Sequence, residues 1–278
     1  MELTNKYNLP GPIINAIKGF DHAYQKGRGD AKISVTQLIN PPLIKFLKEE
    51  HYDEIVEDAS GRIWSIIGSA IHSILEHAGS ANDLTEERLA VTIDDVKISG
   101  QGDLYEADGT LSDYKVTSVW SVKGYAKPEW ISQLNVLAYL YEEAGFKVSK
   151  LQIVAILRDW SKGMSKRGGD YPKCNVKVIP IERWSRDRAL EYIKERIAIH
   201  TSDDVPECTS AEKWEKPTVY AVMKAGRKSA IKLYETREEA EKDDRGTYIE
   251  TRPGSCLRCE DYCSVNKWCP YYENKEEE

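Results

Sequence analysis

The chain has 278 residues, with 39 Lys or Arg and 46 Asp or Glu, so its net charge at neutral pH is −7. This length can bury a substantial core, and one domain with a smaller appendage is the simplest expectation. A net negative charge excludes a surface that binds nucleic acid everywhere, because non-specific affinity comes from cationic contacts with phosphates. No apolar run is long enough to span a membrane and no signal peptide is recognisable, so we expect a cytoplasmic protein without a membrane partner.

The first predicted elements are helices. Ile13 to Tyr24 has amphipathic spacing and leads to a break at Gly27-Arg28-Gly29. From Gly61 to Gly79 apolar residues recur at helical spacing, which predicts a helix packed against a sheet. His72 lies on the polar face of that helix, where periodicity alone favours a solvated histidine.

A β-hairpin is predicted in the middle of the chain. Glu87 to Ile98 alternates between apolar and polar residues, which indicates the strand that precedes it. The runs Gly102 to Glu106 and Thr110 to Thr117 then flank the turn residues Ala107-Asp108-Gly109. We expect this hairpin to lie centrally in a mixed sheet.

The hairpin carries Asp103, Asp113 and Lys115. Asp113 and Lys115 share a face, because strand residues two apart point the same way. A three-residue loop with Gly109 in the left-handed conformation would pair residue 103 with 113, whereas a two-residue loop would pair 104 with 113 and separate the carboxylates. Two carboxylates can hold Mg²⁺ or Mn²⁺, which polarises phosphate and activates water, and Lys115 could position that water or offset negative charge. The alternative is a surface hairpin with solvated charges.

Helices and strands alternate after the hairpin, which is the α/β pattern. The segment Trp120 to Trp130 is predicted to be a loop whose two tryptophans could stack bases, although buried packing is the commoner use. The later predictions are a helix over Glu129 to Ala144, a buried strand over Leu151 to Leu157, a strand over Val176 to Ile181 and a helix over Glu182 to His200.

Three groups of basic residues are candidate DNA contacts. Solvated charge is the ordinary use of each group, and only clustering around the proposed site would favour DNA contact. The groups are Lys123 with Lys127; Arg158 with Lys162, Lys166 and Arg167; and Lys224 with Arg227, Lys228 and Lys232.

A linker over Asp203 to Cys208 divides the chain into predicted domains of residues 1–202 and 203–278. The second domain contains a hairpin that turns at Ala225-Gly226, a short helix capped by Thr236, and an acidic end, Glu276 to Glu278, that we expect to fray.

Four of the six cysteines lie close together near the end of the chain. Their spacing is Cys256-x2-Cys259-x3-Cys263-x5-Cys269, and four thiolates can enclose a zinc ion or anchor an iron-sulfur cluster. This crowding favours metal binding over a secreted disulfide set. The segment has little apolar area to bury, so we expect the metal to order it and fasten it to the rest of the chain. Cys208 could substitute for one of these ligands.

Asp103, nine further residues, Asp113-Tyr114-Lys115 and then a helix carrying Gln133 resemble the PD-(D/E)XK nuclease superfamily, particularly its RecB-like and phage exonuclease branches. Gly68-Ser-Ala-Ile-His72 is similar to the motif in which RecB-like enzymes supply a histidine ligand to the metal. Gln133 to Tyr139 resembles their glutamine-and-tyrosine helix, although Leu137 occupies the usual place of the tyrosine. The resemblance covers Gly61 to Tyr139 best.

This resemblance implies an α/β, restriction-endonuclease-like core, with a central mixed β-sheet flanked by helices, and a small cysteine-rich C-terminal part. It implies metal ligation by His72, Asp103 and Asp113, and catalytic roles for Asp103, Asp113, Lys115 and Gln133.

The cysteine set is similar to that of RecB-like nucleases that contain a [4Fe-4S] cluster. The similarity implies such a cluster, or failing that Zn²⁺, on Cys256, Cys259, Cys263 and Cys269. The family usually has a further cysteine where this chain has Asn40 and Pro41.

The function implied by the resemblance is a Mg²⁺- or Mn²⁺-dependent deoxyribonuclease of exonuclease type, acting in recombination, repair or phage DNA metabolism. Its expected partners are DNA ends or single strands, and a single-strand-binding or recombination protein. A non-catalytic zinc or iron-sulfur DNA-binding module on a nuclease-like fold is the main alternative. An electron carrier is disfavoured, because it gives no reason for Asp103, Asp113 and Lys115. The sequence contains no Walker-type phosphate loop, so ATPase activity would need a partner.

Overall fold

The computed structural model describes residues 1–26 and 30–273, and side chains within 1–19 and 30–272. The predicted break at 27–29 and the acidic end at 276–278 lie outside these residues. The chain forms two compact units: Met1–Pro42 with Val56–Val205, and Leu43–Ile55 with Pro206–Glu278. The short segment Leu43–Ile55 therefore belongs to the same unit as the C-terminal residues.

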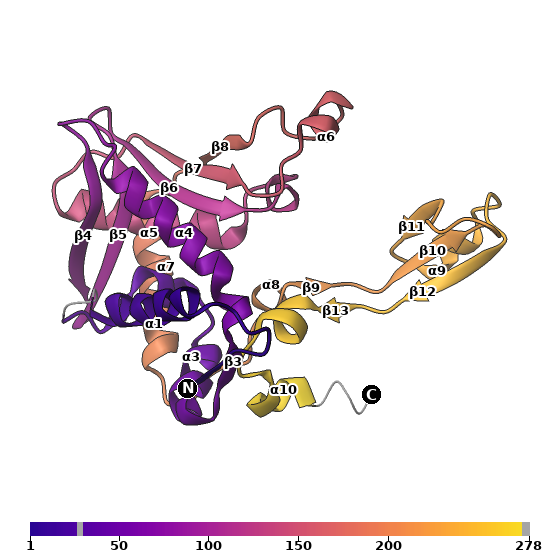
Figure 1. The fold of residues 1–278 in the computed structure, drawn as a ribbon, viewed down its shortest axis with the longest axis horizontal. Helices are drawn as coiled ribbons and strands as arrows, with labels where there is room; N and C mark the ends of the chain where they lie inside the picture. Colours follow the sequence, from indigo (N-terminus) through magenta and orange to yellow (C-terminus); the bar gives the residue numbers. More distant parts are fainter. Residues whose placement is uncertain (27–29, 274–278) are drawn as a thin grey trace. The chain divides into compact units, whose positions relative to one another are not determined.

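A mixed sheet forms the centre of the first unit (Figure 1). Its strand order is β2-β5-β6-β7-β8. Strand β4 lies outside this order and pairs with β5 from end to end. The β2–β5 and β6–β7 pairs are parallel and the remaining pairs are antiparallel. The strands are β2 (Ile33–Ser34), β4 (Leu84–Ile93), β5 (Val96–Tyr105), β6 (Thr110–Thr117), β7 (Lys150–Leu157) and β8 (Val176–Ile181).

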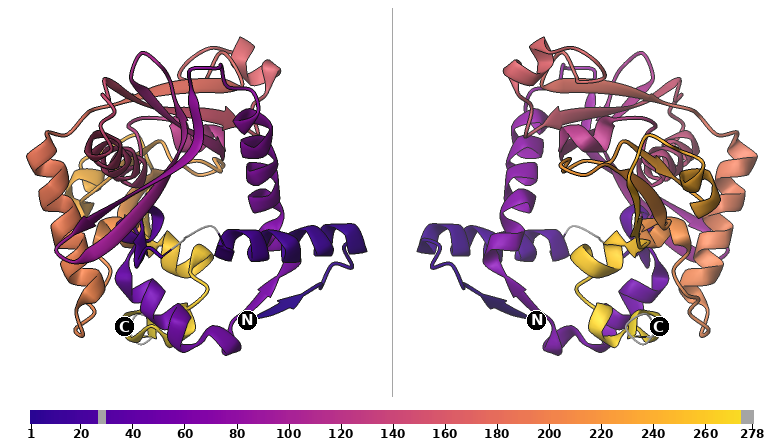
Figure 2. Two further views of the ribbon diagram at one scale, coloured as in Figure 1. Left: turned by 90° about the vertical axis from the view of Figure 1, so that its left-hand side faces the viewer. Right: turned by 90° about the vertical axis from the view of Figure 1, so that its right-hand side faces the viewer.

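Helices cover both faces of this sheet. Helix α4 (Ile63–Glu76) lies on one side, and α5 (Pro128–Glu143) and α7 (Arg186–Thr201) lie on the other (Figure 2). The predicted fold class is confirmed: a central mixed sheet is flanked by helices, and a cysteine-rich part follows. The other elements of this unit are α1 (Gly11–Lys26), α2 (Val35–Ile39), η2 (Ala59–Arg62), η3 (Val119–Val122), α6 (Lys162–Lys166) and the parallel pair β1 (Glu2–Thr4) and β3 (Val56–Asp58).

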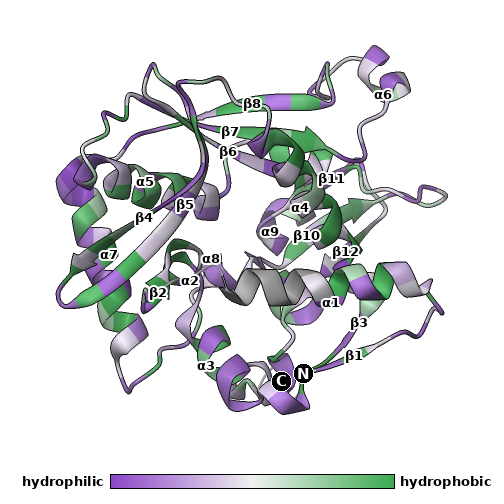
Figure 3. Cartoon of the chain, turned by 60° about the vertical axis from the view of Figure 1, so that its left-hand side comes forward, coloured by the Kyte–Doolittle hydropathy of each residue, from purple (hydrophilic) through white to green (hydrophobic). Residues whose placement is uncertain are grey.

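The core lies between the sheet and α5. Side chains of α5 and of three strands are fully buried there: Leu134, Leu137, Tyr141, Ile98, Leu111 and Ile153. Helix α4 and strand β7 are both largely hydrophobic (Figure 3). However, α4 buries none of its residues completely, and Ile74 remains 69% exposed. This helix therefore packs more shallowly than its apolar spacing predicted.

The strand predicted over Glu87 to Ile98 is confirmed only as far as Ile93. A tight turn at Asp94 and Asp95, whose φ angles are +47° and +60°, divides this stretch between β4 and β5. Positive φ at both central residues fits the backbone twist of two-residue hairpins, where Asn and Gly are the usual signals. The two strands form a long antiparallel pair that leads into the predicted hairpin of β5 and β6.

The second unit contains a three-stranded antiparallel sheet in the order β11-β10-β12. The hairpin predicted near Ala225-Gly226 is confirmed as β10 and β11, and Thr236 caps α9 as predicted. The elements of this unit are α3 (Pro42–Glu50), η1 (Tyr52–Glu54), α8 (Ser210–Lys213), β9 (Glu215–Lys216), β10 (Val219–Met223), β11 (Lys232–Tyr234), α9 (Arg237–Glu241), β12 (Tyr248–Arg252), β13 (Ser255–Cys256), η4 (Arg258–Tyr262), η5 (Asn266–Trp268) and α10 (Pro270–Glu273).

Within the described ranges, no helix combines the length and the apolar character that crossing a bilayer requires.

Candidate metal-binding site

Three carboxylates form a row across neighbouring strands of the sheet. Leu104 pairs with Ser112, so the register places Asp103 opposite Asp113. Gly109 has a φ of +85°, and Glu106 N donates a hydrogen bond to Thr110 O, which closes the three-residue loop. The register that brings the two aspartates to one face is therefore confirmed.

Glu86 extends this row on the other side of Asp103. Thr85 pairs with Leu104 and Glu87 pairs with Gly102, which leaves Glu86 opposite Asp103. Its side chain accepts a short hydrogen bond from Gln101 Nε2. Sequence reasoning missed Glu86, because the turn at Asp94 and Asp95 was not recognised and the register of β4 was therefore unknown.

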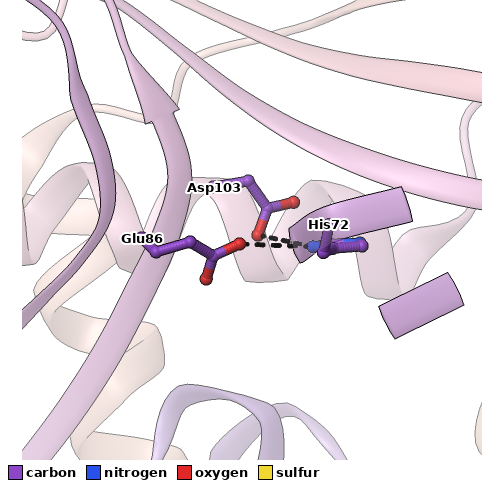
Figure 4. A group of neighbouring side chains, drawn as sticks. All are labelled: His72, Glu86 and Asp103. Carbon is purple, nitrogen blue, oxygen red and sulfur yellow. Dashed lines mark ion pairs between the residues drawn. The ribbon is translucent and has the colours of Figure 1, made fainter. Parts of the chain in front are cut away.

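His72 reaches this row from helix α4 (Figure 4). Its Nδ1 lies 3.4 Å from Glu86 Oε1 and 3.4 Å from Asp103 Oδ1. On the other side of the ring, Nε2 donates a hydrogen bond of 3.2 Å to the carbonyl oxygen of Tyr114. A backbone contact of this kind fixes the orientation and tautomer of an imidazole, and here it leaves Nδ1 facing the carboxylates.

The three side chains fit a metal ion. One ligand atom from each of His72, Glu86 and Asp103 lies within 4.8 Å of the others. Hydrogen bonds to Asp103 and Glu86 raise the pKa of His72 to about 10, so the carboxylates favour a positive charge at this point. A divalent cation would satisfy the same carboxylates and leave the imidazole neutral, because metal and proton compete for Nδ1.

Asp113 lies deeper in the sheet and is only 2% exposed. Its Oδ1 accepts a hydrogen bond of 2.8 Å from Gln133 Nε2 of α5, and its Oδ2 lies 2.6 Å from Lys115 Nζ. Within the described residues, no donor meets Oδ2 with hydrogen-bond geometry. Burial raises the pKa of Asp113, and the charge of Lys115 opposes that shift. A buried carboxylate oxygen of this kind is also suited to a cation.

Asp103 is held in place by the neighbouring strand. It is 8% exposed, and its Oδ2 accepts a hydrogen bond of 2.6 Å from the backbone N of Tyr114. Its Oδ1 therefore remains directed towards His72. The described pairing of β5 with β6 covers Leu104 and Tyr105. At Tyr114 the Asp103 side chain therefore accepts the hydrogen bond that a backbone carbonyl of β5 would otherwise accept.

These side chains line one cleft in the first unit, with a volume of about 690 Å³. The structure brings together every residue of the predicted metal and catalytic site that lies in this unit: His72, Asp103, Asp113, Lys115 and Gln133. Glu76 also lines the cleft, as its position one turn beyond His72 suggested. Arg88 adds a second cation beside Lys115, and its guanidinium donates to Gln101 Oε1 at 2.7 Å.

The other candidates in the first unit lie elsewhere. Tyr139 is buried, with Arg186 over its ring, and does not line the cleft. The guanidinium of Arg158 lies 4.2 Å from the ring centre of Trp64. Trp130 is buried, as packing predicted, whereas Trp120 is 74% exposed. The amine of Lys123 lies 4.1 Å from the ring centre of Trp120, so a cation and an aromatic face are presented together on this loop.

The cysteines of the second unit gather around small apolar cavities. All six cysteines of the chain lie in the described part and none forms a disulfide. Cys174 is exposed, whereas the remaining five are at least partly buried. Cysteines and apolar side chains line the same space, which fits a thiolate-bound metal or cluster in chemical type.

No protein-family model matches the chain, and no curated protein matches it. Among solved structures, "SSO0001" aligns with a TM-score of 0.51 and 19% identity over 74% of this chain and 91% of its own. A protein from Eubacterium rectale, described as a "Putative exonuclease", aligns with a TM-score of 0.32 and 13% identity over 76% of this chain and 91% of its own. The likeness to SSO0001 shows a common fold for most of the chain.

Proposed function

We propose that this chain is a metal-dependent deoxyribonuclease that hydrolyses phosphodiester bonds from DNA ends. The observation that carries the proposal is the meeting of Glu86, Asp103 and Asp113 with His72 and Lys115 in one open cleft. Acidic ligands around one point, with a lysine beside them, suit a reaction in which negative charge develops on a phosphate. The sequence resemblance described above agrees with this chemistry.

We propose His72, Asp103 and Asp113 as metal ligands, with Glu86 as a further ligand that the sequence did not indicate. Oxygen-rich sites with carboxylates suit Mg²⁺ and Mn²⁺. A bound ion of this type supplies Lewis acidity towards a phosphate oxygen and lowers the pKa of water.

Other groups orient the proposed ligands or offset charge on the reacting phosphate. Gln133 donates a hydrogen bond to Oδ1 of Asp113, which favours the orientation of the carboxylate towards the cleft. Lys115 Nζ is close to Asp113 Oδ2 and lies on the same strand face, from which it could offset charge on the reacting phosphate. The carbonyl of Tyr114 orients His72, while the amide of the same residue orients Asp103. The backbone of one residue of β6 thereby orients two of the proposed ligands.

A single DNA strand would bind in the cleft and not over the whole surface, because the net charge of the chain is negative. Arg88 and Lys115 line the cleft, and bound divalent cations would offset the charge of its four carboxylates, Glu76, Glu86, Asp103 and Asp113. Trp120 and Tyr125, 74% and 98% exposed, lie on the loop that follows β6 and could stack on bases.

Cleavage of labelled DNA tests the proposal. Linear single-stranded and double-stranded DNA, labelled at either end, would be incubated with Mg²⁺, with Mn²⁺ or with EDTA, and circular single-stranded DNA would serve as the matched control. We expect release of label from linear DNA with either cation, no release with EDTA, and intact circles. Cleavage of circular DNA, which has no ends, would show endonuclease activity and contradict the proposed exonuclease activity. Binding of DNA without cleavage under any cation would favour the non-catalytic alternative.

A further inference from the structure

The loop between β10 and β11 carries four basic residues and no acidic one. They are Lys224, Arg227, Lys228 and Lys232, and all four are exposed. We call residues 224–232 the basic loop. Its charge is opposite in sign to that of the whole chain, which is −7. None of the four belongs to the described residues that line the cleft of the first unit, so a ligand of the basic loop would occupy a second surface.

Acidic residues of the same small sheet do not neutralise the basic loop. Within the described residues, no ion pair joins an acid to any of its four cations. The amine of Lys232 lies 4.6 Å from the ring centre of Tyr234 instead. Three arginines of this part of the chain differ, because each has an acid of its own: Arg237 with Glu241, Arg245 with Asp243, and Arg252 with Glu250. The positive charge of the basic loop therefore remains available for a ligand.

A tight turn presents three of these cations together. Arg227 N donates a hydrogen bond of 3.0 Å to Lys224 O. Gly226, the third residue of this turn, has a φ of +81°, which is typical of a type II turn. The Cα atoms of the first and fourth residues of a turn lie within about 7 Å of each other. Lys224 and Arg227 are therefore close neighbours, and Lys228 follows directly.

Hydrogen bonds to the sheet hold the basic loop near both ends. Ala225 N donates to Thr247 Oγ1 at 3.1 Å, and Ile231 N donates to Val222 O at 2.8 Å. Thr247 belongs to the connection 242–247, whose two basic and two acidic residues add no net charge beside the loop. An ordered loop loses little conformational freedom when it binds, so its charges are preorganised for a ligand.

The side chains between the cations do not suit a protein partner. They are Ala225, Gly226, Ser229 and Ala230, so the turn offers no aromatic or large apolar anchor. Protein interfaces depend on such anchors at their centre and are poor in lysine. Small side chains instead let a phosphate approach the cations closely, which favours nucleic acid.

Two features favour double-stranded DNA over a single strand. Proteins that bind single strands stack bases on aromatic side chains. No aromatic residue lies between Lys224 and Leu233. A duplex carries one negative charge per about 1.7 Å of its axis, which is twice the density of one strand. A compact group of cations therefore gains more from a duplex.

We propose that the basic loop is a second DNA site, which binds the phosphate backbone of double-stranded DNA irrespective of its sequence. The proposal goes beyond the proposed nuclease function, because duplex binding by the loop requires neither the cleft nor a metal ion. Since the loop and the cleft belong to one chain, a duplex held by the loop raises the effective concentration of DNA ends for the cleft. This last consequence rests on the proposed cleavage, whereas the binding itself does not.

Binding of a duplex in EDTA tests the site without cleavage. The variant R227Q/K228Q would be compared with R237Q/R252Q, which removes two charges from paired arginines of the same part of the chain. Anisotropy of a labelled duplex of about 30 base pairs, measured over a range of salt concentrations, gives both affinities. We expect R227Q/K228Q to bind about tenfold or more weakly, with a slope of log affinity against log salt that is smaller by about 2. R237Q/R252Q should bind like the unaltered protein.

Three results would overturn the proposal. Equal losses in the two variants would assign the effect to net charge, because both variants lose two positive charges. An unchanged duplex affinity of R227Q/K228Q would remove the basic loop from the DNA site. A greater loss for a single strand of the same length than for the duplex would contradict the choice of ligand. Thermal melts of both variants show whether the fold is kept.

Acetylation of the unaltered protein provides a measurement that needs no variant. Lysines would be labelled with acetic anhydride in EDTA, with and without the duplex, and labelling at each lysine followed by mass spectrometry. We expect the duplex to protect Lys224 and Lys228, whereas Lys216 of β9, which is also exposed, should react equally in both states. Equal labelling of Lys224 and Lys228 with and without the duplex would show that DNA does not bind there.

Discussion

Glu86 lies opposite Asp103 on the neighbouring strand, and its backbone has a φ of +52°. A side chain other than glycine is strained in this region, at a cost on the order of 1–3 kcal/mol. The strain accompanies a carboxylate that faces His72 at 3.4 Å. The strained backbone and the contact with His72 therefore meet at the same residue.

We therefore expect two substitutions at this position to separate strain from metal binding. Both E86Q and E86G should lower Mn²⁺ affinity by about tenfold or more, because each removes a charged ligand. Only E86G should also relieve the backbone strain at this position, so its melting temperature should equal or exceed that of E86Q. Calorimetric titration with Mn²⁺ and thermal melts would measure these effects. Unchanged Mn²⁺ affinity in both variants would remove Glu86 from the site.

Asp113, which is buried, and Lys115, which is partly exposed, form an ion pair in the proposed nuclease site. We expect D113N and K115M each to reduce the cleavage rate by about 100-fold or more, since one loses a ligand and the other a charge that stabilises the transition state. K242M, a change in an exposed lysine at the end of α9, is the matched control and should cleave normally. End-labelled DNA with Mg²⁺ gives the rates, and circular dichroism reports the fold. Undiminished cleavage by a variant would exclude that residue from catalysis.

Trp120 is the exposed aromatic side chain beside Lys123 on the loop after β6. Stacking of a base on an aromatic ring contributes about 1–3 kcal/mol, so W120A should weaken single-strand binding by about tenfold. A matched change, Y52A, removes an exposed tyrosine of the second unit and should have no effect. Fluorescence anisotropy with labelled oligonucleotides measures both affinities. Equal affinity of W120A and the unaltered protein would show that DNA does not stack there.

The sequence predicted the parts of the site that local rules control. The three-residue loop and Gly109 set the Asp103–Asp113 register, because loop length and a left-handed residue decide it together. Glu86 was not predicted, because a turn of two aspartates with positive φ lacks the usual glycine signal. Without that turn, the register of β4 against β5 does not follow from the sequence. His72 was placed on the polar face correctly, but periodicity does not say whether a polar face meets water or a cleft. Membership of Leu43–Ile55 in the second unit depends on contacts between residues far apart in sequence, which no local pattern records.

Asp58 connects β1 to the start of η2 and gives a pH-dependent prediction. Its Oδ2 accepts hydrogen bonds from Lys6 N and Thr4 Oγ1, at 2.8 and 2.9 Å, and its Oδ1 accepts from Ser60 N. The bond from Lys6 N is the main cause that lowers the pKa of Asp58 below its ordinary value. A lowered folded-state pKa stabilises the protein above the unfolded value of about 3.9, and this stabilisation is lost as pH falls towards the folded value.

We expect D58N to melt at a lower temperature than the unaltered protein at pH 7, and the difference to shrink progressively as pH falls below about 4, because Asp58 then takes up a proton in the unfolded chain while it stays ionised in the folded one. D170N, a change in an exposed aspartate, controls for charge. Thermal melts from pH 7 to pH 3 measure the difference. A gap that stays constant down to pH 3 would show that the ionised carboxylate is not what stabilises this end of the unit.

Gly100 and Gly68 provide the last prediction, because an added methyl group would meet opposite surroundings at the two positions. A Cβ on Gly100 would lie 2.5 Å from Leu137 Cδ2 and 2.6 Å from Val35 Cγ2, where α5 and α2 approach β5 closely. Overpacking of this kind costs about 1–3 kcal/mol, so G100A should be less stable by that amount. A Cβ on Gly68 meets no atom within 4 Å, and Gly68 lies inside helix α4.

G68A should therefore gain about 0.5–1 kcal/mol, because alanine favours the helix over glycine. Since Gly68 also lines the cleft, the added methyl group would project into the path proposed for DNA. We expect G68A to bind single strands more weakly despite its greater stability. Urea unfolding gives the stabilities and anisotropy gives the affinities. A G68A variant that is both more stable and unchanged in DNA binding would place the DNA strand away from this wall of the cleft.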